Sequence, residues 1–155
     1  MSITSLNVAN SILKRAFAEN IDVTPMKLQK LIYCVYKAYL KETNYSLFEE
    51  NFETWTFGPV VRAVYDEFKY RGGNPINGFA QVDRNGFYKI VAEKDNEVLR
   101  MIISRTWDIY KYYSGTELSV FTHGVGTAWR KAYDKKWSNL LDADIRQEAY
   151  FVRAQ

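Results

Sequence analysis

Apolar residues recur every three or four positions in several stretches of the chain, which is the spacing of an amphipathic helix. The first stretch predicts a helix over residues 6–19, with Ser5 as its N-cap. The second begins at Thr24-Pro25, where a capping hydroxyl precedes a proline whose backbone already suits a first helical turn. Its wide apolar stripe predicts the central core helix and consists of Leu28, Leu31, Ile32, Val35, Tyr36 and Tyr39.

The middle of the chain lacks this spacing. Residues 42–59, ETNYSLFEENFETWTFGP, predict a connection with at most one short helical turn. Pro59 then opens a predicted third helix that ends at Gly72-Gly73. The buried face expected for that helix is Val60, Val61, Val64, Tyr65 and Phe68.

The second half predicts a small β-hairpin followed by further helices. Asn85-Gly86 lies between two strand-like segments, which predicts the hairpin near Phe79–Val91. Helices are expected over residues 93–113, 116–122, 127–136 and 142–153. The fold class is therefore mainly α, a compact irregular helical bundle with one small β-hairpin, formed by residues 1–155 as a single domain.

The amino-acid composition limits the classes of function that we expect for this chain. The chain is 16% aromatic with 12 tyrosines, which favours aromatic packing or a recognition surface. Its net charge is +3, and this charge is spread evenly, which argues against an obligate nucleic-acid binder. A single cysteine, Cys34, is typical of a reduced, cytoplasmic protein. No apolar run reaches the about 18 to 20 residues of a membrane span, so we expect no contact with a membrane.

A catalytic site is hard to assemble from these residues. His123 is the only histidine, no CxxC pair occurs, and no glycine-rich phosphate loop is present, so neither a metal nor another cofactor is expected. Cys34 and His123 could form a nucleophile and base, but a lone cysteine on an apolar helical face is typical of core packing. We therefore interpret Cys34 as packed and His123 as a histidine that orients a turn by hydrogen bonding.

Two further stretches each allow two interpretations. In WRKAYDKKW the aromatic residues Trp129, Tyr133 and Trp137 share one helical face, which favours core packing over base stacking. The interleaved basic residues form the candidate nucleic-acid patch, and they are Arg130, Lys131, Lys135 and Lys136. Around Gly58-Pro59 the aromatic residues Trp55 and Phe57 could cap the core or contact a partner, and the two roles are compatible.

Three stretches together resemble the signature blocks of the SocA/GepA-like family, the Panacea antitoxin domain that is often phage-associated. PMKLQKLIYCVYKAY, residues 25–39, is similar to its K-L-Q-K-L-L-Y helix. Residues 46–72 contain its F-x-A-W-x-x-G-P-V element, matched by Phe52, Trp55, Gly58, Pro59 and Val60, with Tyr65 on the following helix. Its L-S-x-x-T-H-x-x-x-P-W element is matched by Leu118, Ser119, Thr122, His123 and Trp129. Thr54 and Ala128 depart from the family's alanine and proline, and GVGT replaces a more acidic stretch.

The resemblance implies a non-enzymatic antitoxin that binds and neutralises a co-encoded, cognate protein toxin, without a cofactor. The SocA type implies further an adaptor that delivers its toxin to the ClpXP protease, and it allows self-association. The family-specific region would then be the partner-binding candidate, formed by Trp55, Phe57, Gly58, Pro59, Val60, Tyr65, Thr122, His123 and Trp129. The alternative is a nucleic-acid-binding accessory protein of a phage or mobile element.

Overall fold

A computed structural model describes residues 3–81 and 96–152 of the chain. The mainly α class is confirmed, and one two-stranded antiparallel sheet accompanies the helices. The α-helices are α1 (Ser5–Glu19), α2 (Pro25–Thr43), α3 (Arg62–Phe68), α4 (Glu97–Tyr110), α5 (Gly115–His123), α6 (Ala128–Asp134) and α7 (Asp142–Gln147). A 3-10 turn, η1 (Lys69–Arg71), extends α3, and the strands are β1 (Glu53–Trp55) and β2 (Gly58–Val60).

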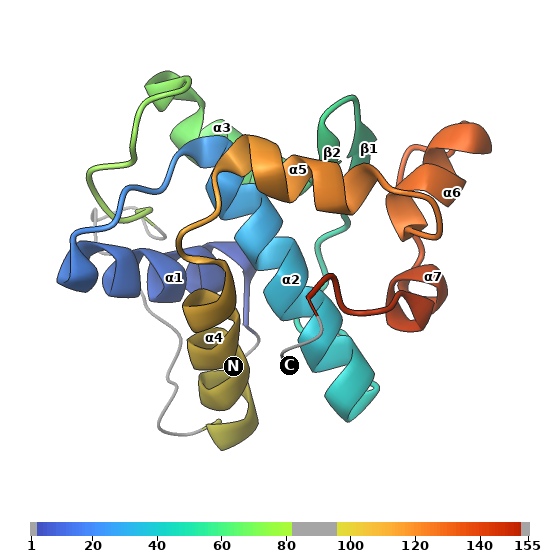
Figure 1. The fold of residues 1–155 in the computed structure, drawn as a ribbon, viewed down its shortest axis with the longest axis horizontal. Coiled ribbons are helices and arrows are strands. Elements are labelled where there is room, and N and C mark those ends of the chain that lie inside the picture. The colour runs from blue at the N-terminus through green and yellow to red at the C-terminus, as the bar shows by residue number, and fades with distance from the viewer. Residues whose placement is uncertain (1–2, 82–95, 153–155) are drawn as a thin grey trace.

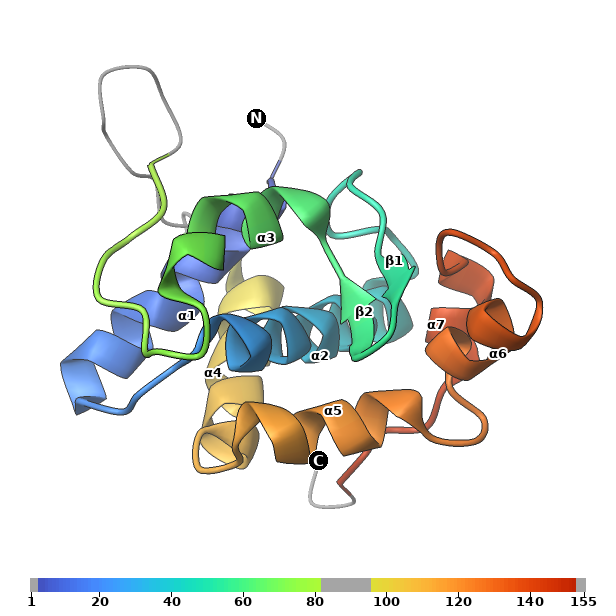
Figure 2. The ribbon, with the colours of Figure 1, turned by 90° about the horizontal axis from the view of Figure 1, so that it is seen from above.

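Helix α2 is the centre of the molecule. It runs through the middle of the ribbon and contacts α1, α3, α4, α5 and α7 (Figures 1 and 2). Leu28, Ile32 and Val35 are fully buried, as the sequence pattern predicted. Thr24 caps this helix by accepting a hydrogen bond from the Lys27 amide, and Pro25 occupies the first turn, also as predicted. Because α2 is covered on several sides, four of its polar residues are buried with its apolar stripe, namely Lys27, Gln29, Lys30 and Lys37.

The described sheet lies where the sequence predicted a connection. β1 pairs with β2 in the register Glu53↔Val60, Thr54↔Pro59 and Trp55↔Gly58. The Thr54 amide donates to Ser138 O, away from β2, so Thr54 and Pro59 form a non-hydrogen-bonded pair in which the N–H that proline lacks is not needed. Three-residue strands are too short to show an alternating pattern. Most of the hairpin predicted near Phe79–Val91 lies outside the described residues.

Several predicted helix boundaries were wrong. The third helix begins at Arg62 rather than Pro59, because Pro59 belongs to β2. α7 ends at Gln147 rather than Arg153, and α6 ends at Asp134 because the backbone at Lys136 turns into the left-handed region. At the N-terminus the cap of α1 is Thr4 rather than Ser5.

Burial also differs from prediction at three aromatic residues. Tyr65 was expected in the core but is 40% exposed. Core packing was also favoured for the face of Trp129, Tyr133 and Trp137, but only Trp129 is buried. Tyr133 is 50% exposed, and Trp137, which follows the end of α6, is 36% exposed. Cys34 is buried, as predicted. Within residues 3–81 and 96–152, no helix is both long and apolar enough to cross a membrane.

Candidate functional site

The three sequence blocks meet at the turn of the β1–β2 hairpin. From α6, Trp129 Nε1 donates to Trp55 O over 2.7 Å. From α5, His123 Nε2 lies 2.7 Å from Thr56 O, and Ser119 Oγ donates to the next carbonyl, Phe57 O, also over 2.7 Å. Side chains of the third block therefore hold three successive carbonyls of the second block.

The first block holds the other end of the same hairpin. Lys30 Nζ donates to Pro59 O over 3.0 Å. Gln29 makes two hydrogen bonds to Val61, because its amide nitrogen donates to Val61 O and its oxygen accepts from Val61 N, each over 3.0 Å. Fixed side chains thus bind the hairpin backbone from both sides, which fixes its position on the helical core.

Gly58 is required by this close packing. Its φ is +116°, a backbone conformation that residues other than glycine rarely adopt. A Cβ at this position would lie 2.8 Å from Thr122 Oγ1 and 3.0 Å from Lys30 Nζ. Thr122 is itself buried and donates to Ser119 O, so it cannot move away freely. The absence of a side chain at Gly58 therefore lets β2 approach Thr122 on α5 closely.

The hairpin presents aromatic side chains outward. Phe57 is 64% exposed at the turn. Trp55 is partly exposed and packs edge-on against Tyr65, with 4.7 Å between ring centroids. The Arg62 guanidinium lies over the Trp55 ring and pairs with Glu53, and its hydrogen bonds hold the pKa of the Glu53 carboxyl below its usual value. The structure thus places Phe57 on the surface and gives Trp55 both a packing role and an accessible edge.

An apolar pocket of about 360 Å³ opens beside these aromatic residues. Its walls come from the first turn of α2, from the hairpin and from α3. Lys30, which is 1% exposed, forms part of the wall. Burial lowers the pKa of Lys30 to about 7, because desolvation disfavours the charged ammonium.

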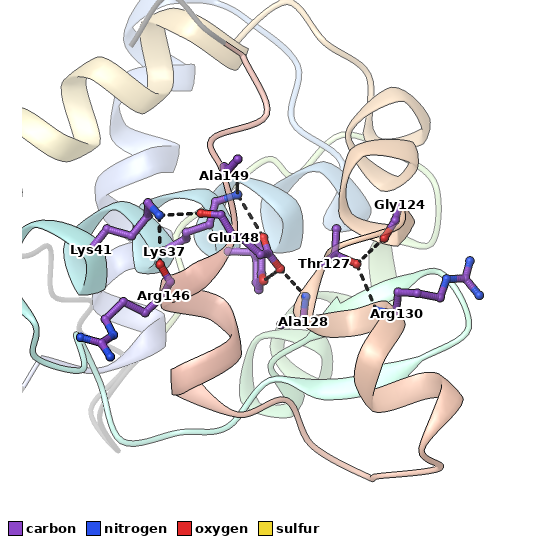
Figure 3. A network of polar contacts seen from close by, with 10 residues as sticks. Lys37, Lys41, Gly124, Thr127, Ala128, Arg130, Arg146, Glu148 and Ala149 are labelled. Atoms are coloured by element: carbon purple, nitrogen blue, oxygen red, sulfur yellow. Dashed lines mark hydrogen bonds and ion pairs between the residues drawn. The ribbon is translucent and has the colours of Figure 1, made fainter.

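A buried carboxylate holds α6 and therefore Trp129 in position (Figure 3). Glu148 Oε1 accepts from the Ala128 amide over 2.6 Å and from Tyr33 OH over 2.5 Å. Its other oxygen pairs with Lys37 Nζ at 3.1 Å, and all three side chains are buried. Because Ala128 is the first residue of α6, the carboxylate also faces the positive end of that helix.

The candidate catalytic pair does not form. Cys34 lies in the core, and burial raises the pKa of its thiol to about 12, which opposes formation of a nucleophilic thiolate. Both ring nitrogens of His123 are within 2.7 Å of backbone carbonyls, those of Ser119 and Thr56. His123 therefore orients the hairpin turn, as interpreted from the sequence. The residues that the structure describes contain no group of three or more potential metal ligands.

The basic patch is partly neutralised within the chain. Arg130 donates to His123 O and lies over the Trp129 and Tyr133 rings, while Lys131 pairs with Asp144 at 2.9 Å. Lys135 and Lys136 are exposed beyond the end of α6. The patch therefore shares its helix with the hairpin support but contributes no side chain to the pocket.

Sequence reasoning found most of the hairpin site and missed part of its support. The matched residues Trp55, Gly58, Pro59, His123 and Trp129 come together, and Tyr65 packs against Trp55 from α3. Gln29 and Lys30 belong to the first family block, but the sequence did not predict them as site residues, although two polar residues within an apolar helix signal a buried role. No sequence pattern around Glu148 predicted its buried role, because its partners Tyr33 and Ala128 are distant in sequence.

Comparisons with known proteins agree with this arrangement. A family model described as "Antitoxin SocA-like, Panacea domain" matches residues 28–130, which contain the hairpin and the side chains of α2, α5 and α6 that hydrogen-bond to its backbone. The protein named Antitoxin SocA, from Caulobacter vibrioides (strain NA1000 / CB15N), is 30% identical over 130 residues. This alignment covers 83% of the present chain and 69% of the Caulobacter protein. No solved structure matches the chain significantly.

Proposed function

The chain belongs to the SocA-like, Panacea family of antitoxins, and we propose that it neutralises a co-encoded protein toxin by binding it directly. The observation that carries this proposal is the convergence of all three family blocks on one hairpin, whose exposed aromatic residues face outward. Backbone that is held this firmly presents side chains in a fixed arrangement, which lowers the entropy lost on binding.

Exposed aromatic residues suit a binding surface. Large aromatic side chains are enriched where protein interfaces gain most of their energy. Phe57 at the turn and Tyr65 on α3 are both accessible, and neither is needed to fill the core. We therefore assign the toxin contact to the surface formed by Trp55, Phe57 and Tyr65, with the buried motif residues as its support.

Catalysis has no part in the proposal. The Cys34 thiol is buried and both His123 ring nitrogens face backbone carbonyls, so these two residues do not form a nucleophile and base. The Ser119 hydroxyl lies 3.2 Å from His123 Nδ1 but donates its hydrogen bond to Phe57 O. Neutralisation by binding also needs no cofactor. We place this activity in the cytoplasm, where an unpaired, buried cysteine stays reduced.

The test is co-expression. Each open reading frame beside this gene is induced in a bacterial host, with and without the antitoxin, and colony formation is counted. One neighbour should be toxic alone and harmless with the wild-type protein. If no neighbour is toxic, or if the antitoxin never restores growth, the proposal is wrong.

Delivery of the toxin to a protease is a finer step of the same proposal. An adaptor for ClpXP shortens the lifetime of its toxin, whereas simple masking leaves that lifetime unchanged. The half-life of tagged toxin after translation is stopped, measured with and without the antitoxin in hosts that have or lack ClpX, separates the two mechanisms. We do not propose the nucleic-acid alternative, because Arg130 and Lys131 already contact groups within the chain.

A further inference from the structure

The apolar pocket beside the hairpin has the dimensions of a specific binding site. Its volume of about 360 Å³ lies within the range of roughly 300 to 1,000 Å³ found for ligand pockets. Apolar side chains supply most of its wall, including Met26 from α2, Val60 from β2 and Val64 from α3. Phe57 and Tyr65 also line it, and both are exposed to solvent.

The pocket is already formed without a partner. Its hairpin wall is held by the hydrogen bonds from Lys30 to Pro59 O and from Gln29 to Val61. The opposite end of the hairpin is held by Trp129. Because these supports are buried, an entering group would not have to order the backbone first.

The pocket is lined, within the described residues, by positive charge without a balancing negative charge. Among the lining residues that the structure describes, Lys30 is the only basic one, and none carries a carboxylate. Within the part of the chain that the structure describes, its ammonium makes a single hydrogen bond, to Pro59 O, although an ammonium has three donors. The first turn of α2 also lines the pocket, contains no acidic residue and carries the positive end of the helix dipole.

We propose that this pocket receives a segment of the partner toxin in which a large apolar side chain stands next to a carboxylate. The apolar group would fill the space between Val60, Val64 and Tyr65, and the carboxylate would face the Lys30 side of the wall. An approaching anion favours the charged form of Lys30, whose pKa burial lowers to about 7. This inference rests on the proposed function, because it names the chemistry of the toxin segment.

A protein segment is favoured over a small molecule by the rim of the pocket. Phe57, which is 64% exposed, and Tyr65, which is 40% exposed, offer apolar surface outside the cavity as well as inside it. A small ligand would use the cavity alone, whereas a chain segment covers the rim too. An apolar anchor in a pocket with surrounding aromatic contacts is the usual arrangement at the centre of a protein interface.

The first test uses two dyes that differ in charge. Anilinonaphthalene sulfonate is an apolar anion, and phenylnaphthylamine has the same ring system without the sulfonate. Both are titrated into the wild-type protein and into Lys30→Gln, which removes the charge and keeps an N–H donor on the side chain. Phe57→Asp places an acid at the rim, and Tyr45→Asp makes the same change at an exposed site beyond the end of α2.

For Lys30→Gln the expected result is a loss of anion binding only. Lys30→Gln should weaken the sulfonate dye about tenfold, the equivalent of one hydrogen bond to a charged group, and leave the neutral dye unchanged. Phe57→Asp should also weaken the sulfonate dye, and Tyr45→Asp should change neither. If Lys30→Gln weakens both dyes equally or neither, or if Tyr45→Asp acts like Phe57→Asp, the charge assignment is overturned. Circular dichroism confirms that each variant is folded, and Phe57→Asp tests the site even where Lys30→Gln fails to fold.

The second test uses the toxin identified by co-expression. Purified toxin should displace the sulfonate dye from the antitoxin, and Phe57→Asp should lose neutralisation while Tyr45→Asp keeps it. If the complex retains the dye, or if Phe57→Asp neutralises fully, the pocket is not the toxin site although the antitoxin function stands. A change from dimer to monomer in Phe57→Asp would instead assign the pocket to a second copy of this chain and overturn the inference. Should no neighbour be toxic, the proposed function fails, while the dye test still decides the chemistry of the pocket.

Discussion

The indole nitrogen of Trp129 donates a hydrogen bond over 2.7 Å to the backbone carbonyl of Trp55, which lies 74 positions earlier in the chain. This bond joins α6 to the hairpin, and both residues belong to the blocks that resemble the antitoxin family. Trp55 and Trp129 therefore have different structural roles. Trp129 is buried and supports the backbone, whereas Trp55 is supported and keeps part of its ring accessible.

Trp129→Phe should loosen the hairpin. The substitution keeps an aromatic ring but leaves Trp55 O without its donor, so we expect a loss of about 1 to 3 kcal/mol in the free energy of unfolding. Urea denaturation measures this loss. Trp137→Phe changes an exposed indole near the same helix and is the matched control. Equal stabilities of the two variants would show that the bond to Trp55 O contributes nothing.

Gly58→Ala should strain the turn into β2. The added Cβ would combine an unfavourable φ with a contact of 2.8 Å to Thr122 Oγ1. We expect a loss of about 1 to 3 kcal/mol in stability and weaker neutralisation. Gly73→Ala is the control, since a Cβ there meets no atom within 4 Å. Thermal denaturation of both proteins decides the point, and unchanged stability in Gly58→Ala would contradict the close packing of β2 on α5.

Glu148→Gln should destabilise the chain strongly. The carboxylate accepts from Tyr33 OH and the Ala128 amide and pairs with Lys37, which is buried. Neutralising it leaves the Lys37 ammonium without an ionic partner, and breaking a buried pair in this way costs about 3 to 5 kcal/mol. Glu97→Gln removes a carboxylate from an exposed pair and should cost less than about 1 kcal/mol. Chemical denaturation of the two variants gives the comparison, and similar losses would refute the structural role of the buried network.

Lys30 should make stability depend on pH. Burial lowers its pKa from the usual 10.5 to about 7, so between these pH values the unfolded chain holds a proton that the folded chain has released. The free energy of unfolding therefore contains a term that rises with pH across this window, by up to about 1.4 kcal/mol per pH unit, and is lost as the pH falls towards 7. Lys30→Met removes this term.

The difference in stability between the wild type and Lys30→Met isolates that term, because the other titrating groups are common to both proteins. This difference should increase in favour of the wild type from pH 7 to pH 10. Denaturant titrations at four or five pH values measure it, and the same series on Lys135→Met is the exposed control. A flat difference would mean that the Lys30 ammonium is not desolvated in the folded protein.

The helices were largely predictable because each contributes an apolar stripe over several turns, as in α2. The β1–β2 hairpin was not, because two three-residue strands show no alternation and Pro59 mimics a helix start. The family blocks contain Ser119, His123 and Trp129, but the sequence did not predict that these side chains bind consecutive carbonyls. Such convergence depends on how α5 and α6 pack against the hairpin, and this packing is set by distant contacts such as that of Glu148 with Tyr33.

Hydrogen exchange of the antitoxin, measured by mass spectrometry with and without its toxin, tests the proposed contact most directly. The account predicts slower exchange in peptides that cover residues 53–65, which contain the hairpin and its exposed aromatic residues, and no change in peptides from α7. Protection confined to α7 or to other segments away from the hairpin, with residues 53–65 exchanging as in the free protein, would contradict it.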